Sequence, residues 1–339
     1  MNMNAFRTAM AIIGVLVLLI LLGQLLIVLL LVFAAILLAI LLRNLGLLIA
    51  SRTPLSPNAG VGVVCLLLVA GLAGFFMSEG PRMAARLGEV IEVLPDAAAQ
   101  LRVAIAGTDW GAYVLDNTPN LTGGGDFSVT GALGGTLSRA VGVVANTVVV
   151  LSVGIYLALD PRLYRRGLLH LVPTRRRRRA AEVLDAVEKG LWKWLIGQFV
   201  DMVAVGLMIG VGLWALGIPL PIALGLIAGL TNFIPILGPF LGGAAAVLIA
   251  FAQSPVDALY VVILIVVVQQ IDGQVLMPLI QQRATALPPA LTVLAVVVGG
   301  ILFGFIGVLL ATPMLLVILI ASRMIYVNDL LDGDARDGP

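Results

Sequence analysis

Long apolar runs separated by short polar segments dominate this chain. The runs cover residues 9–42, 59–77, 141–159, 196–217, 219–252, 256–271 and 290–321. A helix needs about 20 mostly apolar residues to cross a bilayer. Most runs therefore predict one membrane helix, and the run 9–42 predicts two short helices that turn near Gly23 and Gln24. The first run is far longer than the apolar part of a signal peptide, about 7–15 residues, so we expect it to stay in the membrane.

The C-terminal part of the chain repeats one pattern, an apolar helix followed by a long interrupted apolar block. Helix 196–217 precedes the block 219–252, which is interrupted between Thr231 and Pro239. A helix at about 256–278 precedes the block 290–321, which is interrupted by Gly299, Gly300, Gly304 and Gly307. We expect both blocks to be re-entrant hairpins, because full crossings would put Arg283 outside. Two such units in opposite orientation are typical of secondary transporters.

Composition supports the membrane interpretation. Hydrophobic residues make up 61% of the chain and charged residues 11%, with a mean hydropathy of +1.13, which excludes an ordinary soluble domain. The predicted fold class is an all-α polytopic membrane protein with about eight membrane segments, two of them broken or re-entrant hairpins in an inverted arrangement. The expected parts are paired N-terminal helices with an inner loop (1–58), membrane helices that flank an outer-face amphipathic region at 80–136 (59–159), a basic cytoplasmic segment (160–195), a transport core (196–325) and a cytoplasmic tail (326–339).

Positive charge near helix ends predicts which loops are cytoplasmic. The heaviest cluster consists of Arg162, Arg165, Arg166 and the run Arg175 to Arg179. We interpret it as a topology determinant that also attracts anionic lipid, in preference to a nucleic-acid or regulatory site. Arg43 and Arg52 mark a second inner loop and Arg7 predicts a cytoplasmic N-terminus; we expect the C-terminus on the same side.

Residues 81–136 differ from the rest because charged and apolar residues alternate there at near-helical spacing. Met83, Leu87, Ile91 and Leu94 fall on one side, which predicts an amphipathic helix on the outer face. A substrate-capturing domain is the alternative, although no set of side chains in this stretch converges on one chemistry. The second half predicts a loop.

Residue types that carry catalysis or bind metals are scarce. Cys65 is the only cysteine and His170 the only histidine, so we expect neither a disulfide nor a metal site. The sequence lacks a nucleotide-binding loop, zinc-ligand spacing and a Ser/His/Asp set. We therefore expect no enzyme activity and no cofactor, and energy for any transport would come from a gradient.

Polar residues in apolar runs are the first candidates for a transport pathway, because they are costly in lipid. Between Lys193 and Arg283 the chain has no lysine or arginine, yet it retains Gln198, Asp201, Asn232, Gln269 and Asp272. Gln198 and Asp201 are three residues apart, as are Gln269 and Asp272, so each pair shares a helix face. The alternative is that each pair marks a helix end at the interface.

The two interruptions supply the remaining candidates. Pro235 and Pro239 cannot donate backbone hydrogen bonds, so they would free carbonyls beside the Asn232 amide, with Gly238 between them; a packing kink is the alternative. Gly304 and its neighbouring glycines indicate close helix packing first, and a gating hinge second.

Three strings in this order resemble the AI-2E transporter family of autoinducer 2 exporters: Asn232–Pro239, then Gln269–Asp272 with Val275–Pro278, then Gly299–Pro313. The resemblance spans nearly the whole chain. It implies a bacterial or archaeal multi-pass permease that forms a homo-oligomer, with some members linked to export of the quorum-sensing signal and others to sodium/proton exchange. The family usually shows glutamate at the position of Asp272 and often asparagine at that of Gly273; aspartate keeps the carboxylate but shortens its reach.

Together these observations predict a secondary transporter in the bacterial inner membrane that exports a small polar molecule, with an autoinducer 2-like signal as the substrate that the resemblance suggests. Its partners would be this small molecule, membrane lipids and a coupling proton or sodium ion, with no nucleic acid. A monovalent cation (Na⁺)/proton antiporter that uses Asp201 and Asp272 is the first alternative. A passive channel or a membrane scaffold is the alternative from another class.

Overall fold

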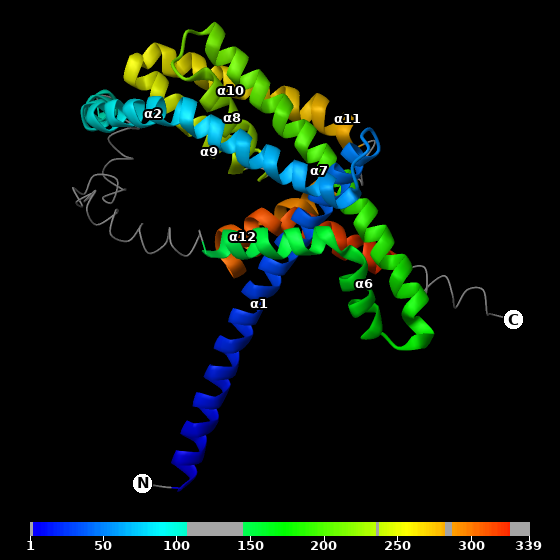
Figure 1. Cartoon of the computed structure of the whole chain (residues 1–339). Coiled ribbons are helices and arrows are strands. Elements are labelled where there is room, and N and C mark those ends of the chain that lie inside the picture. Colours follow the sequence, from blue (N-terminus) through cyan, green and yellow to red (C-terminus); the bar gives the residue numbers. More distant parts are fainter. Residues whose placement is uncertain (1–2, 107–144, 235–236, 282–286, 326–339) are drawn as a thin grey trace, which may run out of the picture. The chain divides into compact units, whose positions relative to one another are not determined.

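The computed structural model describes residues 3–106, 145–234, 237–281 and 287–325, and all its regular elements there are helices (Figure 1). Within these ranges, five helices are long and apolar enough to cross a membrane, or up to six if the bent pair Ala145–Leu159 and Pro161–His170 counts as one span. This confirms an all-helical, polytopic membrane protein in the described part. The count is below the predicted number of about eight, for reasons given below.

The described residues form two compact units. The first comprises 3–65, 145–195 and 287–325, and the second 66–106, 196–234 and 237–281. Two helices contribute to both units, α2 (Pro57–Ala106) and α7 (Thr174–Ala215).

The first unit contains α1 (Met3–Ala50), the start of α2, the helix Ala145–Leu159, α6 (Pro161–His170), the first part of α7, and α12 (Pro289–Ser322). One core in it joins α1, α2 and the helix Ala145–Leu159 through the buried side chains Ala39, Leu42, Val61, Val64 and Ala158. Beside this core Arg43 donates to Asn58 Oδ1 at 2.8 Å and to the Ala158 carbonyl at 3.5 Å. The predicted inner-loop arginine Arg43 therefore also links three helices.

The turn predicted near Gly23 and Gln24 is wrong. Helix α1 runs without interruption over 48 residues, which is about 72 Å at a rise of about 1.5 Å per residue. A lone glycine costs a helix only about 1 kcal/mol relative to alanine, and the surrounding leucine and alanine residues favour helix. A single crossing by α1 would put Arg7 and Arg43 on opposite faces of the membrane. The two arginines then cannot both mark the cytoplasmic side, so Arg7 no longer supports a cytoplasmic N-terminus.

Helix α2 does not end where the predicted span 59–77 ends, because it continues to Ala106. A proline inside a helix removes one hydrogen bond and kinks the chain, but Pro81 does not end this helix. Its membrane-length part is Pro57–Arg82. The helix predicted after residue 81 is thus confirmed up to Ala106, whereas its apolar side chains and the loop that follows lie outside the described residues.

Helix α12 reverses its direction at Gly304, which has φ 62° and ψ −143°. This left-handed conformation is one that essentially only glycine adopts without strain. As a result Gly299 lies against Gly307, and a Cβ on Gly299 would be 2.6 Å from the Gly307 carbonyl oxygen. Eight residues along a straight helix would separate them by about 12 Å. The second apolar block is therefore interrupted at Gly304, one of the four predicted glycines.

The second unit contains the later parts of α2 and α7, then α8 (Pro221–Thr231), α9 (Leu237–Gln253), α10 (Pro255–Ile271), a π-helical turn (Asp272–Leu276) and α11 (Met277–Gln281). Its buried core joins α7, α8, α9 and α10, with Val205, Leu213, Leu224, Ala246 and Val261 among its members. Helices α8 and α9 are too short for separate spans. Together with the uninterrupted α1, they account for the lower span count.

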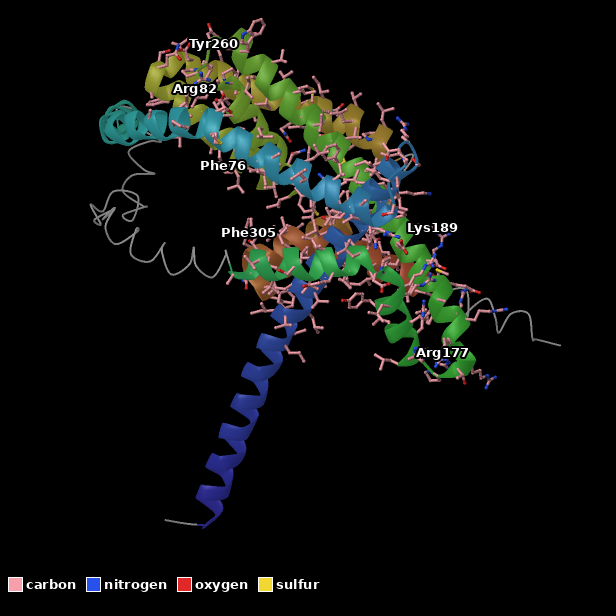
Figure 2. The ribbon with its side chains drawn as sticks, in the orientation of Figure 1. Phe76, Arg82, Arg177, Lys189, Tyr260 and Phe305 are labelled. Atoms are coloured by element: carbon pink, nitrogen blue, oxygen red, sulfur yellow. The ribbon has the colours of Figure 1, made fainter. Side chains whose placement is uncertain are left out.

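Much of the helix surface exposes large apolar side chains to the surroundings. Between 17% and 33% of each candidate span is buried within the chain, and Phe76 and Phe305 are each 65% exposed (Figure 2). Such surfaces are stable in contact with lipid or with another membrane protein, and not in water.

Candidate functional site

Glycines bring α7 and α8 into backbone contact in the second unit. Gly206 and Gly210 on α7 are four residues apart, as are Gly225 and Gly229 on α8. A Cβ on Gly225 would be 2.7 Å from the Gly206 carbonyl oxygen and 2.8 Å from the Gly210 Cα, so no larger side chain fits. Small residues at this spacing are typical of close helix pairs in membranes. Because Met202 lies beside Gly229 and Gly210 beside Pro221, the helices run antiparallel.

The same register places the end of α8 beside the polar residues of α7. Helix α8 ends at Thr231, and Asn232 is its C-terminal cap. The chain then reverses into α9, where Gly238 packs on Thr231, and a Cβ there would be 2.7 Å from the Asn232 Cα. Helices α8 and α9 are thus two arms of one hairpin, and the predicted interruption at 231–239 is its tip.

Four polar side chains gather at this tip, and all are buried. Asn232 Nδ2 donates a hydrogen bond of 2.6 Å to Asp201 Oδ2. Gln198 Nε2 donates to the Asn232 carbonyl at 3.1 Å, which satisfies one of the carbonyls left without a partner at a helix end. The exposed fractions of Gln198, Asp201, Asn232 and Asp272 are 7%, 2%, 6% and 8%. We call these four residues the polar cluster.

Asp272 reaches the cluster from α10. Its carboxyl lies within hydrogen-bonding reach of the Asp201 carboxyl. It opens the π-helical turn Asp272–Leu276, which replaces regular helix at this point. Such turns often occur at functional sites. The sequence predicts both carboxylates individually, but it does not predict that they meet.

Two neighbouring carboxyl groups in a buried site constrain what the site can hold. Within the described part of the chain, Asp201 Oδ1 and Asp272 Oδ1 are buried and have no hydrogen-bond donor. Two adjacent buried negative charges repel each other and lack the solvation of water. A proton shared between the carboxyls or a bound cation would relieve both effects, so this arrangement suits reversible binding of a small positive charge.

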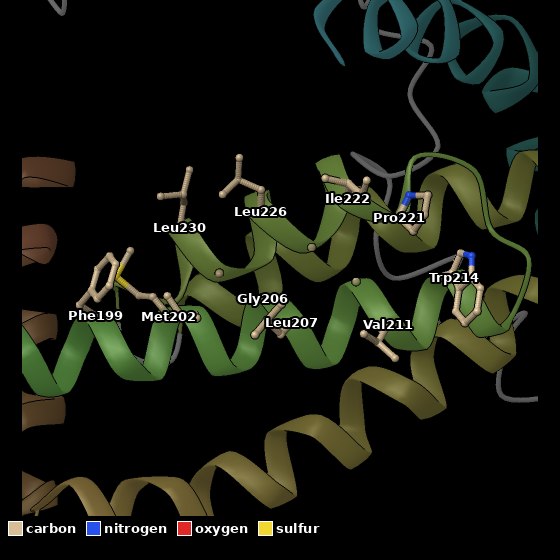
Figure 3. A pocket seen from close by; sticks show the side chains of 14 residues that line it. Phe199, Met202, Gly206, Leu207, Val211, Trp214, Pro221, Ile222, Leu226 and Leu230 are labelled. Carbon is tan, nitrogen blue, oxygen red and sulfur yellow. The ribbon is translucent and has the colours of Figure 1, made fainter. Parts of the chain in front are cut away.

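A separate apolar groove of about 620 Å³ lies between α7 and α8 (Figure 3). Figure 3 shows Phe199, Leu207 and Trp214 of α7 with Leu226 and Leu230 of α8 along it. Its lining contains no charged residue. The indole N–H of Trp214 is the only N–H or O–H group among the side chains that line it, so a small polar solute would find few hydrogen-bond partners there. We therefore assign the candidate site to the polar cluster and not to this groove.

The other predicted site residues lie around the cluster or away from it. Gln269 is half-buried one turn before Asp272, and its backbone carbonyl accepts a hydrogen bond from the Asp272 backbone amide within the helix. Pro239 is half-buried in the first turn of α9, and Pro235 lies outside the described residues. Gly304 belongs to the first unit, where it forms the turn of α12. The structure therefore brings together four of the nine predicted positions, the residues of the polar cluster, through side-chain hydrogen bonds and the pair of carboxyl groups.

Sequence analysis missed the residues that position the cluster. Gly206, Gly210, Gly225 and Gly229 set the distance and register between α7 and α8. Their signal was present, because two glycine pairs at four-residue spacing in consecutive apolar helices are the pattern of close helix packing.

Known proteins resemble the chain along most of its length. A model of the AI-2E family transporter matches residues 8–326. "Putative transport protein YueF" of Bacillus subtilis is 28% identical over 270 residues, which are 76% of this chain and 73% of that protein. "Putative transport protein YrrI" of the same organism is 36% identical over 158 residues, or 47% and 45% of the two chains. "Putative transport protein MT0215" of Mycobacterium tuberculosis is 37% identical over 106 residues, or 31% and 29%. The matched stretch thus spans less than half of YrrI and of MT0215.

The family model confirms the resemblance inferred from the three strings, since it covers all of them. It also agrees with an all-helical chain whose apolar spans carry a few buried polar side chains. The chain therefore belongs to the AI-2E transporter family, a family of membrane transporters and not of enzymes.

Proposed function

We propose that this protein is a secondary transporter that exports a small polar molecule and couples export to proton movement at Asp201 and Asp272. The observation that carries the proposal is the contact of two buried carboxyl groups beside an amide at a hairpin tip. A carboxyl pair can take up and release a proton as its surroundings change. An adjacent amide offers both a donor and an acceptor to a polar solute.

The hairpin itself supports this assignment. Broken helices in secondary transporters place helix ends near the middle of the membrane, and α8 ends in this way at Asn232. We also propose that the two interrupted blocks are re-entrant hairpins of opposite orientation. The protein would act as a homo-oligomer. The proposal also places the α6–α7 segment and the C-terminus on the cytoplasmic side of the bacterial inner membrane, because the arginines concentrate there.

An autoinducer 2-like signal is the substrate that we propose to test first. Purified full-length protein would be reconstituted into liposomes loaded with autoinducer 2, and efflux would be followed with and without an imposed proton gradient. We expect a proton gradient of one sign to accelerate efflux and the opposite sign to slow it. Efflux that is equally fast under both gradients would exclude proton coupling and favour a passive channel, and efflux equal to that of protein-free liposomes would exclude this substrate.

A monovalent cation/proton antiporter remains the second candidate, favoured by the unpaired oxygens Asp201 Oδ1 and Asp272 Oδ1. Carboxylate and amide oxygens are suitable ligands for hard cations. The discriminating test adds Na⁺ outside liposomes that hold an acidic interior and a pH-sensitive dye. Rapid loss of the pH gradient on Na⁺ addition, without any organic solute, would favour the antiporter; an unchanged gradient would favour solute export.

A membrane scaffold is the candidate from another class, with the basic α6–α7 segment as its contact surface. It predicts no flux of solute or ions in either liposome assay. Flux in either assay that depends on the protein would exclude a role limited to scaffolding.

A further inference from the structure

The short helix α6 has a geometry that the transport proposal does not use. It follows the helix Ala145–Leu159 after a bend of 91°. Asp160 fixes the bend, because its side chain accepts a hydrogen bond of 3.2 Å from the Leu163 amide and Pro161 opens the new helix. If Ala145–Leu159 crosses the membrane, a right-angle bend at its end lays α6 along the membrane surface.

One side of α6 packs on α7. Arg165 forms an ion pair with Asp185 of α7 at 2.5 Å. Arg177 lies near the start of α7 (Figure 2) and donates to the Leu169 carbonyl of α6 at 2.9 Å. These contacts hold the two helices together and fix which face of α6 points away from α7.

The face that points away from α7 is apolar and exposed. Leu163, Leu168 and Leu171 are 59%, 52% and 83% exposed, and Tyr164 beside them is 41% exposed. At about 100° per residue these four side chains fall within one arc, and Arg162 and Arg166 lie on the other side. No residue of α6 is buried by the described parts of the chain.

Exposed arginines lie on the other side of α6 and at the start of α7. Arg162 and Arg166 of α6 and Arg175 and Arg176 of α7 are all exposed. Arg175 and Arg176 stand in the first turn of α7, which has no acidic residue, and cations there oppose the helix dipole. Their position therefore does not stabilise α7, but it does concentrate positive charge beside α6.

We propose that α6 is an interfacial helix that inserts its apolar stripe into the cytoplasmic leaflet and binds anionic phospholipid through these exposed arginines. An amphipathic helix with leucine on one face and arginine on the other has the composition of such helices. Anionic headgroups attract basic residues beside the membrane. The partner is thus a lipid surface that carries negative charge, and α6 is a lipid-binding element distinct from the polar cluster.

The test measures how deeply each face of α6 enters the bilayer. Leu168→Cys and Arg166→Cys would be made in a Cys65→Ala background, so that each protein has one cysteine for an environment-sensitive fluorophore. The two positions lie on opposite sides of α6 and form a matched pair. The labelled full-length proteins would be placed in nanodiscs, where both membrane faces are accessible, either with zwitterionic lipid alone or with added phosphatidylglycerol.

We expect the probe at position 168 to be quenched by lipids with a shallow spin label and protected from iodide, and the probe at 166 to show the reverse. Protection at 168 should increase several-fold with phosphatidylglycerol and should not respond to inorganic phosphate added to zwitterionic nanodiscs. Replacing Arg162 and Arg166 by Gln, with the probe at 168, should abolish the effect of phosphatidylglycerol.

Equal iodide access at the two positions in both lipid mixtures would overturn the interfacial assignment. Protection at 168 that is the same with and without phosphatidylglycerol would overturn the anionic preference. Efficient disulfide cross-linking of the unlabelled Leu168→Cys protein to a second copy in nanodiscs would indicate a protein contact, through self-association, in place of the lipid surface.

Discussion

Replacing Asn232 by alanine would leave the Asp201 carboxyl buried without its amide donor. The Nδ2–Oδ2 distance is 2.6 Å, and the two residues are 6% and 2% exposed, so water does not replace the lost partner. A hydrogen bond to a charged group contributes about 1.5–3 kcal/mol. We expect Asn232→Ala to destabilise the protein, and we expect a coupling energy of about 1.5–3 kcal/mol between Asn232→Ala and Asp201→Ala in a double-mutant cycle.

The cycle can be measured by unfolding the purified protein in mixed micelles with increasing SDS, followed by tryptophan fluorescence. A control cycle pairs Asn232→Ala with Asp257→Ala. Asp257 lies fifteen residues before Asp272 on the same helical stretch, or about 22 Å along the axis. Distant pairs are additive within about 0.3–0.5 kcal/mol. A coupling between Asn232 and Asp201 no larger than this control would refute the charged hydrogen bond.

Two backbone predictions and one topological prediction test other parts of the fold. Gly225→Leu should cost about 1–3 kcal/mol of stability through overpacking and abolish flux, because its Cβ would be 2.7 Å from the Gly206 carbonyl; normal flux in liposomes would contradict the close pairing of α7 and α8. Gly304→Ala should lower the free energy of unfolding by about 1–3 kcal/mol, because alanine is strained at φ 62°; an unchanged SDS midpoint would argue against the reversal of α12. Ser254→Cys in a Cys65→Ala background should react with an impermeant thiol reagent added outside intact cells, and labelling only after lysis would invert the proposed topology.

The interruptions in the apolar blocks were predictable because their signal is local. Proline and glycine act on the backbone at their own position, and the breaks after Thr231 and at Gly304 fall where the sequence placed them. Polar residues in apolar runs were equally easy to identify from the sequence, because a polar side chain is costly in lipid and each one therefore indicates a functional site. Four of them, Gln198, Asp201, Asn232 and Asp272, are buried together in the structure.

The contacts between these residues were not predictable, because they depend on how helices pack. Helices α10 and α12 carry apolar residues on every side. Hydrophobic periodicity therefore does not identify which face of such a helix points inward. The meeting of Asp201 with Asp272 depends on the glycine contacts of α7 with α8 and on the packing of α10. The uninterrupted α1 was missed for another reason: Gly23 and Gln24 alone do not overcome the helix propensity of the residues around them.

Proton movement during solute efflux is the measurement that tests the central claim most directly. Proteoliposomes would hold autoinducer 2 and a pH-sensitive dye, and efflux and internal pH would be recorded together for the parent, Asp272→Asn and the control Asp257→Asn. The account predicts that protons move in the direction opposite to the solute during efflux by the parent and by Asp257→Asn. Asp272→Asn keeps the side-chain shape but loses the ionisable proton, so it should show no proton movement. Proton-coupled efflux by Asp272→Asn at the rate and pH dependence of the parent would contradict the account.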